Sequence, residues 1–171
     1  MQSTVELCEQ HLGPNAVETA RALTNLARAA VQRGETETAE PALRRALAVQ
    51  QQCLTADNPD TGLTLWHLAE ALRGLSRLGD AERLARRALE VWEGHFGADH
   101  EWTAWALISL SKIKLARGDA TEADELAGRA AQILTLVYGP EHAEVGSTLK
   151  LQMSALMTSG KPRAAEPPRA N

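Results

Sequence analysis

One short sequence pattern recurs four times at a fixed spacing, and this spacing restricts the fold more than any other feature of the chain. Each copy is a polar corner that begins with a large apolar or aromatic residue and often contains Gly or Pro. Each begins 42 residues after the one before it, at Leu12, Leu54, Phe96 and Tyr138. A fixed period without gaps indicates a repeat array in which every unit is one supersecondary element.

The segments between the corners have the pattern of paired helices. Hydrophobic residues make up 44% of the 171 residues but aromatic residues only 4%, so any core is built mainly from Ala and Leu, which are strong helix formers. In the first unit a helix is predicted over about 17–33 and a second over about 36–53, with Gly34 ending the first. The packing face of the first helix is expected to contain Leu23, Leu26, Ala27 and Ala30. The sequence therefore predicts an all-α protein made of antiparallel helix pairs.

The period predicts where the units begin and end. We expect an array over residues 1–160, divided into a half unit 1–12, full units 13–54, 55–96 and 97–138, and a partial unit 139–160. The chain opens and closes partway through a unit, which predicts a piece of a larger protein. Residues 161–171 are polar and contain prolines, and we expect them to form a disordered tail.

Small residues distinguish among the two-helix repeats of this length, which include tetratricopeptide-like and HEAT or armadillo arrays. A close crossing of two helices needs small side chains, because a larger side chain would push the backbones apart. Small residues recur at three positions, each spaced by 42: Ala27, Ala69 and Ser111; Ala39, Ala81 and Ala123; Ala46, Ala88 and Ala130. These offsets favour the tetratricopeptide arrangement.

Other segments carry a closer resemblance. The corners Gly139-Pro140-Glu141-His142 and Gly97-Ala98-Asp99-His100, the core Asn25-Leu26-Ala27 and the runs Arg45-Ala46-Leu47 and Arg87-Ala88-Leu89 resemble the 42-residue tetratricopeptide repeats of the kinesin light chain type. The resemblance covers about residues 3–167. It implies a right-handed α-solenoid, a cytoplasmic protein–protein interaction scaffold rather than an enzyme, and a concave groove lined by the first helix of each pair. It also implies a role within a larger signalling or regulatory protein.

The groove is the candidate binding site. The resemblance implies that the first helices line it, and helical spacing places one strip of residues on their free faces: Arg21, Asn25, Arg28, Trp66, His67, Glu70, Arg73, Trp105, Ser109 and Lys112. In the family an asparagine at the position of Asn25 binds the ligand backbone, but only Asn25 keeps it here.

Two tryptophans and the charges of the strip suggest what binds there. Trp66 and Trp105 replace Thr24 and Arg21 at their repeat positions, so they are either ligand anchors or residues that fill space between helices. Basic residues outnumber Glu70 on the strip. We therefore expect a locally basic groove that suits an acidic peptide segment, although the net charge of the chain is −4.

Other chemistries have little support in the sequence. His100 and His142 occupy equivalent corner positions, where capping a helix is the expected role. His67 and Glu70 have a spacing that suits metal ligands, but no third ligand is evident. We expect no cofactor, no metal site, no catalytic residues and, given the acidic charge, no nucleic-acid partner. No apolar run is long enough to span a membrane, and Cys8 and Cys53 are expected to be reduced thiols.

Self-assembly is the alternative function. The last helix, about 143–159, lacks a partner helix, and terminal repeats normally need a polar cap. We expect Leu151, Leu156 and Met157 to be exposed there, which would allow a homo-oligomer to form through the terminal helices.

Overall fold

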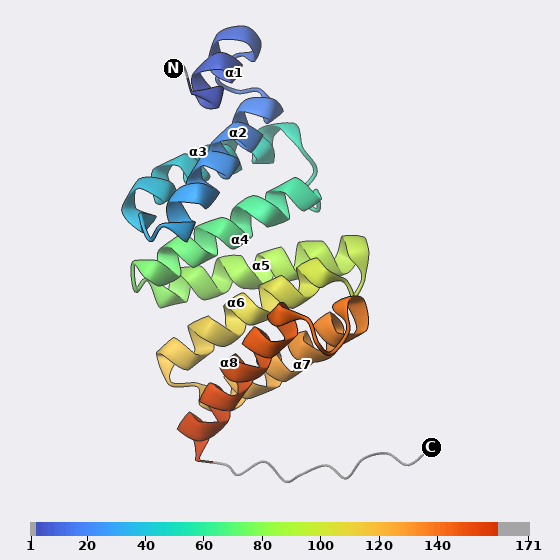
Figure 1. Ribbon diagram of the computed structural model, residues 1–171. Coiled ribbons are helices and arrows are strands. Elements are labelled where there is room, and N and C mark those ends of the chain that lie inside the picture. Colours follow the sequence, from blue (N-terminus) through green and yellow to red (C-terminus); the bar gives the residue numbers. More distant parts are fainter. Residues whose placement is uncertain (1–2, 161–171) are drawn as a thin grey trace.

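The computed structural model describes residues 3–160, and within that range it contains eight helices and no strand (Figure 1). In chain order the helices are α1 (Thr4–Leu12), α2 (Val17–Gln32), α3 (Thr36–Cys53), α4 (Pro59–Gly74), α5 (Leu78–Phe96), α6 (Glu101–Arg117), α7 (Ala120–Tyr138) and α8 (Ala143–Ser159). The expected all-α solenoid is confirmed. The predicted tail, residues 161–171, lies outside the described residues.

Local sequence explains where the helices begin and end. Asn58 caps α4 by accepting a hydrogen bond from the Asp60 N–H, with Pro59 at the first helical position. The expected capping by His100 and His142 is confirmed, since each ring accepts a hydrogen bond from a backbone N–H of the following helix. Between the helices of the middle pair, Ser76 has a φ of 58°, a left-handed conformation that glycines adopt at the other two hairpin corners.

The contacts between helices show which side of the stack is concave. The pairs α2–α3, α4–α5 and α6–α7 are the hairpins, and each second helix also packs on the first helix of the next pair. The first helices α2, α4, α6 and α8 contact one another in turn, whereas α3, α5 and α7 make no such contacts in the part of the chain described. Because the first helices lie closer together than the second helices, the stack curves around them and they line its inner side.

Small side chains make the helix crossings close, as expected. Ala39, Ala81 and Ala123 are at most 1% exposed. The same is true of Ala46, Ala88 and Ala130. The largest fully buried side chain is Trp92 of α5, whose indole packs directly on Gly62 of α4. Trp92 Nε1 donates a hydrogen bond to the Pro59 carbonyl over 3.3 Å. A glycine at position 62 is therefore what lets α5 approach α4 so closely.

Two expectations about apolar residues are wrong, and both errors occur at the ends of the stack. Leu26 is 53% exposed, although Leu68 at the next equivalent position is 1% exposed, because the nine-residue α1 is too short to reach it. In α8 the expected exposure of Met157 is confirmed, but Leu151 and Leu156 are half-buried. The other large apolar side chains of α8 that are exposed are Leu149 and Met153, at 41% and 60%.

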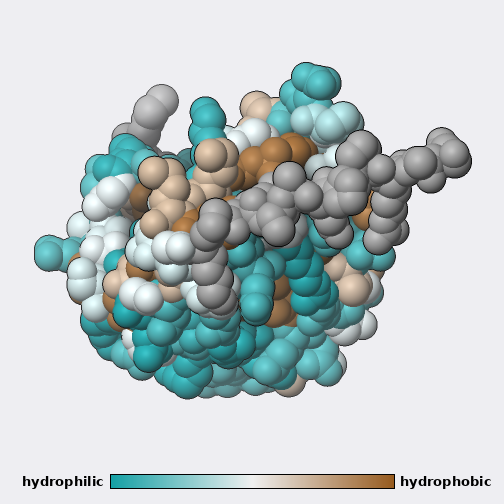
Figure 2. Space-filling view, turned by 90° about the horizontal axis from the view of Figure 1, so that it is seen from below, coloured by the Kyte–Doolittle hydropathy of each residue, from teal (hydrophilic) through white to brown (hydrophobic). Residues whose placement is uncertain are grey.

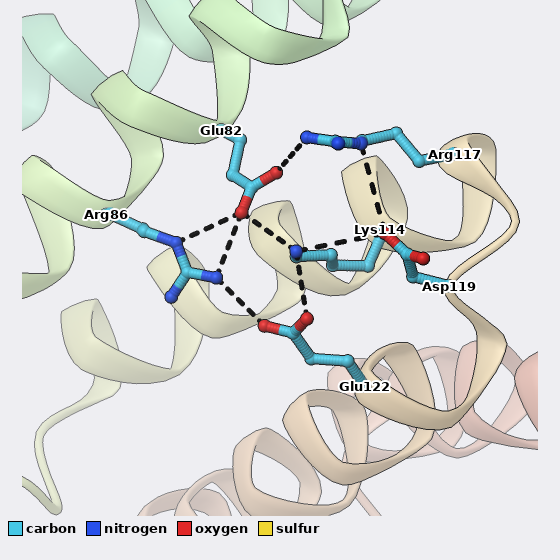
Figure 3. Close-up of polar contacts among 6 residues, drawn as sticks. All are labelled: Glu82, Arg86, Lys114, Arg117, Asp119 and Glu122. Atoms are coloured by element: carbon cyan, nitrogen blue, oxygen red, sulfur yellow. Dashed lines mark hydrogen bonds and ion pairs between the residues drawn. The ribbon is translucent and has the colours of Figure 1, made fainter.

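An ion-pair network joins α5, α6 and α7 (Figure 3). At its centre is Lys114, which is 7% exposed and lies 2.8 Å from a carboxylate oxygen of Glu82 and 2.8 Å from one of Glu122. Hydrogen bonds to these two carboxylates raise the pKa of Lys114. Glu82 is also held by Arg86 at 2.9 Å and Arg117 at 2.5 Å. The network fixes α6 against both of its neighbours and thereby fixes the residues that α6 presents to the groove.

Glu82, not Lys114, is expected to carry most of the stability of this network. Leu72 occupies the position equivalent to Lys114 one repeat earlier and is fully buried, so Lys114→Leu should lower the free energy of unfolding by no more than about 1 kcal/mol. Glu82→Leu leaves three cations without their shared acceptor and should cost about 2–3 kcal/mol. Urea unfolding followed by circular dichroism measures both. A larger loss for Lys114→Leu than for Glu82→Leu would contradict this assignment.

Candidate functional site

The predicted groove residues all lie on first helices, but they differ in exposure. Arg21, Asn25 and Arg28 of α2 and Lys112 of α6 are exposed. Trp66, Glu70, Arg73 and Trp105 are half-buried, whereas His67 and Ser109 are buried, at 5% and 1% exposed. The strip therefore has a charged rim above a partly buried aromatic floor.

Two hollows divide the strip. The larger, about 300 Å³, lies across α2, α4 and α6 and is called the tryptophan cavity below. Eight of the ten predicted residues line it: Arg28, Trp66, His67, Glu70, Arg73, Trp105, Ser109 and Lys112. The smaller, about 160 Å³, is lined by the other two, Arg21 and Asn25, together with Asp60, Gln50 and Leu63. The structure thus places together the residues that the repeat spacing selects.

Trp66 and Trp105 contribute to both packing and the cavity surface. Their ring centroids are 6.3 Å apart, and the Trp66 ring also lies 6.0 Å from that of the buried Trp92. Trp66 Nε1 is buried and has no hydrogen-bond partner in the described part of the chain. Because a buried donor without a partner is costly, this N–H is a group that a ligand in the cavity could satisfy.

His67 is a neutral side chain at the floor of the tryptophan cavity. Burial and, to a smaller extent, the nearby positive charge of Arg28 lower its pKa to about 4, although the negative charge of Glu70 acts in the opposite direction. Nε2 of His67 is buried without a hydrogen-bond partner among the described residues. At neutral pH the ring offers a hydrogen bond but no charge.

The basic character of the groove is smaller than the sequence indicates, because two of its four cations are neutralised. Arg73 lies 2.9 Å from Glu70, which also accepts a hydrogen bond from Ser109 Oγ over 2.5 Å. Arg21 lies 2.7 Å from Asp60. The two cations of the strip with no ion pair in residues 3–160 are Arg28 and Lys112, and both line the tryptophan cavity.

Sequence reasoning missed Asp60 and Gln50 in the smaller hollow. Asp60 lies in the first turn of α4, and no groove residue was predicted in that turn. Gln50 lies on α3, a second helix, and is 1% exposed; its Nε2 donates to the Asp60 carbonyl over 3.3 Å and its Oε1 has no described partner. A signal was available, since the equivalent residues Trp92 and Leu134 are apolar and a glutamine there departs from the pattern.

A hollow of about 540 Å³ lies outside the groove, between α3 and α5 and over α4. Its four arginines are already paired: Arg44 with Glu40, Arg83 with Asp80, Arg86 with Glu82, and Arg87 with Glu90. It occupies the gap between second helices that do not contact each other. The hollow therefore has no unpaired arginine among the described residues that line it. The tryptophan cavity is the better candidate site.

Glu70 contacts side chains other than His67 in this arrangement. Glu70 is bound by Arg73 and Ser109, and no hydrogen bond joins it to His67 in the described residues. Within residues 3–160 no group of three His, Cys, Asp or Glu side chains could hold a metal ion. Over the same range, no helix has the length and apolar character needed to cross a membrane.

Comparisons with known proteins indicate the same helical-repeat arrangement. A family model described as tetratricopeptide repeat matches residues 1–52 and 60–135. Two crystal structures of a Podosopora anserina protein, described as a kinesin light chain with nearly identical TPR-like repeats, are 20% identical to this chain. They match 91% of this chain and 74% of their own length, with TM-scores of 0.75 and 0.74.

The crystal structure of BtubC (BKLC) from P. vanneervenii is also similar, with 17% identity and a TM-score of 0.76. It matches 84% of this chain, which spans 57% of BtubC. No curated protein sequence matches the chain.

Proposed function

Because the chain belongs to the tetratricopeptide repeat family, a family of non-enzymatic scaffolds that bind other proteins, we propose that it binds a peptide segment of a partner protein in its concave groove. The observation that carries the proposal is the tryptophan cavity, which three successive first helices line together. An extended peptide running along the strip would contact all three helices at once. Half-buried aromatic rings beside an arginine are typical anchors of such surfaces.

The charges of the cavity favour an acidic peptide. Arg28 and Lys112 are exposed at its rim and have no ion pair within the described chain, so an acidic side chain would meet two uncompensated cations. Trp66 Nε1 and His67 Nε2 are buried beneath them without partners among residues 3–160, and they would supply hydrogen bonds to a carboxylate or a backbone carbonyl. Long-range attraction by the two cations would also speed association with an acidic segment.

Charge reversal at the rim is expected to weaken the binding of acidic peptides and to leave the fold intact. Arg28→Glu/Lys112→Glu should reduce binding of an acidic peptide pool at least about tenfold, because the ligand then meets like charges. The matched control is Arg83→Glu/Arg129→Glu, an equal change of charge on the second helices α5 and α7. Trp105→Ala tests the aromatic floor in the same assay, which is fluorescence anisotropy of labelled acidic and basic pools. Equal binding of both pools by all the variants would end the proposal.

The extent and setting of the array are also proposed. We propose that the repeats extend over residues 1–160 and are followed by a separate tail, 161–171, and that the array serves a larger signalling or regulatory protein in the cytoplasm. Self-assembly through the terminal helices, the alternative function, involves other surfaces, because Leu149 and Met153 of α8 line neither hollow of the groove.

A further inference from the structure

The free face of α8 is the face that the other first helices use to bind their second helices. Leu149 and Met153 stand at the positions of Leu107 and Ser111 of α6, which are fully buried in the α6–α7 hairpin. Ser111 Oγ donates to the Ala123 carbonyl of α7. On α8 the same positions are 41% and 60% exposed. The face that each hairpin buries is therefore present on α8, and no helix of residues 3–160 packs on it.

A hollow beside this face shows which element is missing. It measures about 520 Å³ and is lined by α7 residues such as Gly128 and Ala131 and by Leu149 and Gln152 of α8. Five of its seven lining residues have equivalents, two periods earlier, that line the hollow between α3 and α5, where α5 forms the opposite wall. The hollow at α8 thus resembles the earlier one, but no described helix forms its opposite wall. Seen from the α8 end, the surface there carries apolar patches among hydrophilic side chains (Figure 2).

The complementary face occurs on α1. By the 42-residue register, α1 corresponds to the last nine residues of α5 and α7 and to residues 46–54 at the end of α3. Leu7 of α1 is 41% exposed, whereas Val49, Val91 and Ile133 at its equivalent positions are at most 5% exposed, packed inward in their own hairpins. No residue of α1 is buried. Val5, on its other side, already packs against α2. Within residues 3–160, one first-helix face on α8 and one second-helix face on α1 therefore have no helix packed on them.

We propose that α1 of a second copy docks on the free face of α8, so that the molecules associate head to tail. The contact repeats one that the chain makes three times within itself, between the C-terminal half of a second helix and the N-terminal half of a first helix. Leu7 of one copy packs on Leu149 of the other, in the manner of Ile133 on Leu107. The free faces lie at opposite ends of the stack (Figure 1), so the contact forms between molecules and not within one.

The geometry of this contact sets the kind of assembly. The two faces differ, so the interface is heterologous. Each bound pair leaves one free face of each kind, one on either copy, which allows further growth. A nine-residue helix buries little area, so each contact is weak and association rises gradually with concentration. The faces lie outside the groove, so this inference does not depend on peptide binding there.

Sedimentation velocity of the wild-type chain and of single variants tests the arrangement. Over a roughly hundredfold range of concentration, the sedimentation coefficient of the wild type should rise without a plateau at the dimer. Leu7→Glu and Leu149→Glu should each sediment as monomers, because each places a charge in the contact. Met153→Glu, at a more exposed position, provides a second α8 variant. Gln51→Glu adds the same charge to an exposed residue of α3 and should behave as the wild type.

A mixture of two variants gives the decisive result. Leu7→Glu retains an intact α8 face and Leu149→Glu retains an intact α1 face, so an equimolar mixture should form a pair and no larger species. Association by Leu7→Glu alone would indicate contact between two α8 faces and would overturn the proposal. The proposal would also be overturned by a wild type that stays monomeric over the whole concentration range. Association by a chain that ends at Gly160, when the full chain does not associate, would overturn it as well. Acidic-peptide binding by the same variants should be unchanged, which separates this test from that of the groove.

Discussion

Trp92→Ala is expected to lower the free energy of unfolding by about 3–5 kcal/mol, the largest effect of any single substitution considered for this chain. The indole is 1% exposed and packs among Val91, Ala106 and neighbouring aromatic rings. Its ring centroid lies 5.3 Å from that of Trp102. Removing it opens a cavity at the junction of α4, α5 and α6 and leaves the Pro59 carbonyl without its indole donor. Urea unfolding followed by circular dichroism measures the loss.

The contact between Trp92 and Gly62 allows a sharper form of this test. A Cβ atom at position 62 would lie 2.6 Å from Trp92 Nε1, so Gly62→Ala should destabilise the wild type. In the Trp92→Ala background the obstacle is gone, and the same change should stabilise the protein by up to about 1 kcal/mol through the helix propensity of alanine. The sign of the Gly62→Ala effect should therefore reverse between the two backgrounds. Equal effects in both would show that Trp92 is not what requires the glycine.

Acidification is expected to remove up to about 3 kcal/mol of stability through His67 alone. Its pKa is about 4 in the folded chain, whereas that of an unfolded histidine is about 6.5. The unfolded state therefore takes up a proton at a higher pH than the folded state does. The contribution of the neutral ring is complete above about pH 6.5 and is lost as the pH falls toward about 4.

His67→Phe removes the titration and keeps a ring of similar size. As the pH falls from 7 to 4, the unfolding free energy of the wild type should decrease relative to that of His67→Phe. His95→Phe, the same substitution at an exposed histidine of α5, is the matched control. A constant difference between wild type and His67→Phe over this range would show that His67 titrates alike in both states.

The sequence predicts the fold well because the fold is periodic. Small residues such as Ala39 and Ala81 identify the helix crossings, and their burial follows from the spacing alone. The end faces depend instead on which neighbour is present. Leu26 has the pattern of a packing residue, but α1 does not reach it, and Leu149 resembles its buried equivalents but has no helix against it.

The candidate site could be predicted only in outline. Helical spacing indicates which residues face the groove, and eight of the ten meet in one cavity. Spacing does not give the pairing of charges between neighbouring units, because the partner lies about one period away in the chain. Asp60, which neutralises Arg21, is 39 residues distant and was not considered. The depth of His67 likewise depends on how closely α2, α4 and α6 pack, which no local pattern records.

The four tryptophans have an optical consequence for experiments on this protein. Trp66, Trp92, Trp102 and Trp105 all lie in α4, α5 and α6, and the remaining described helices contain none. Indole emission therefore reports only on the middle of the stack, whereas far-ultraviolet ellipticity reports on every helix. In an array whose units contact only their neighbours, the ends can open before the centre. The interval between the two optical signals on heating is then a direct measure of how strongly the terminal helices are coupled to the centre.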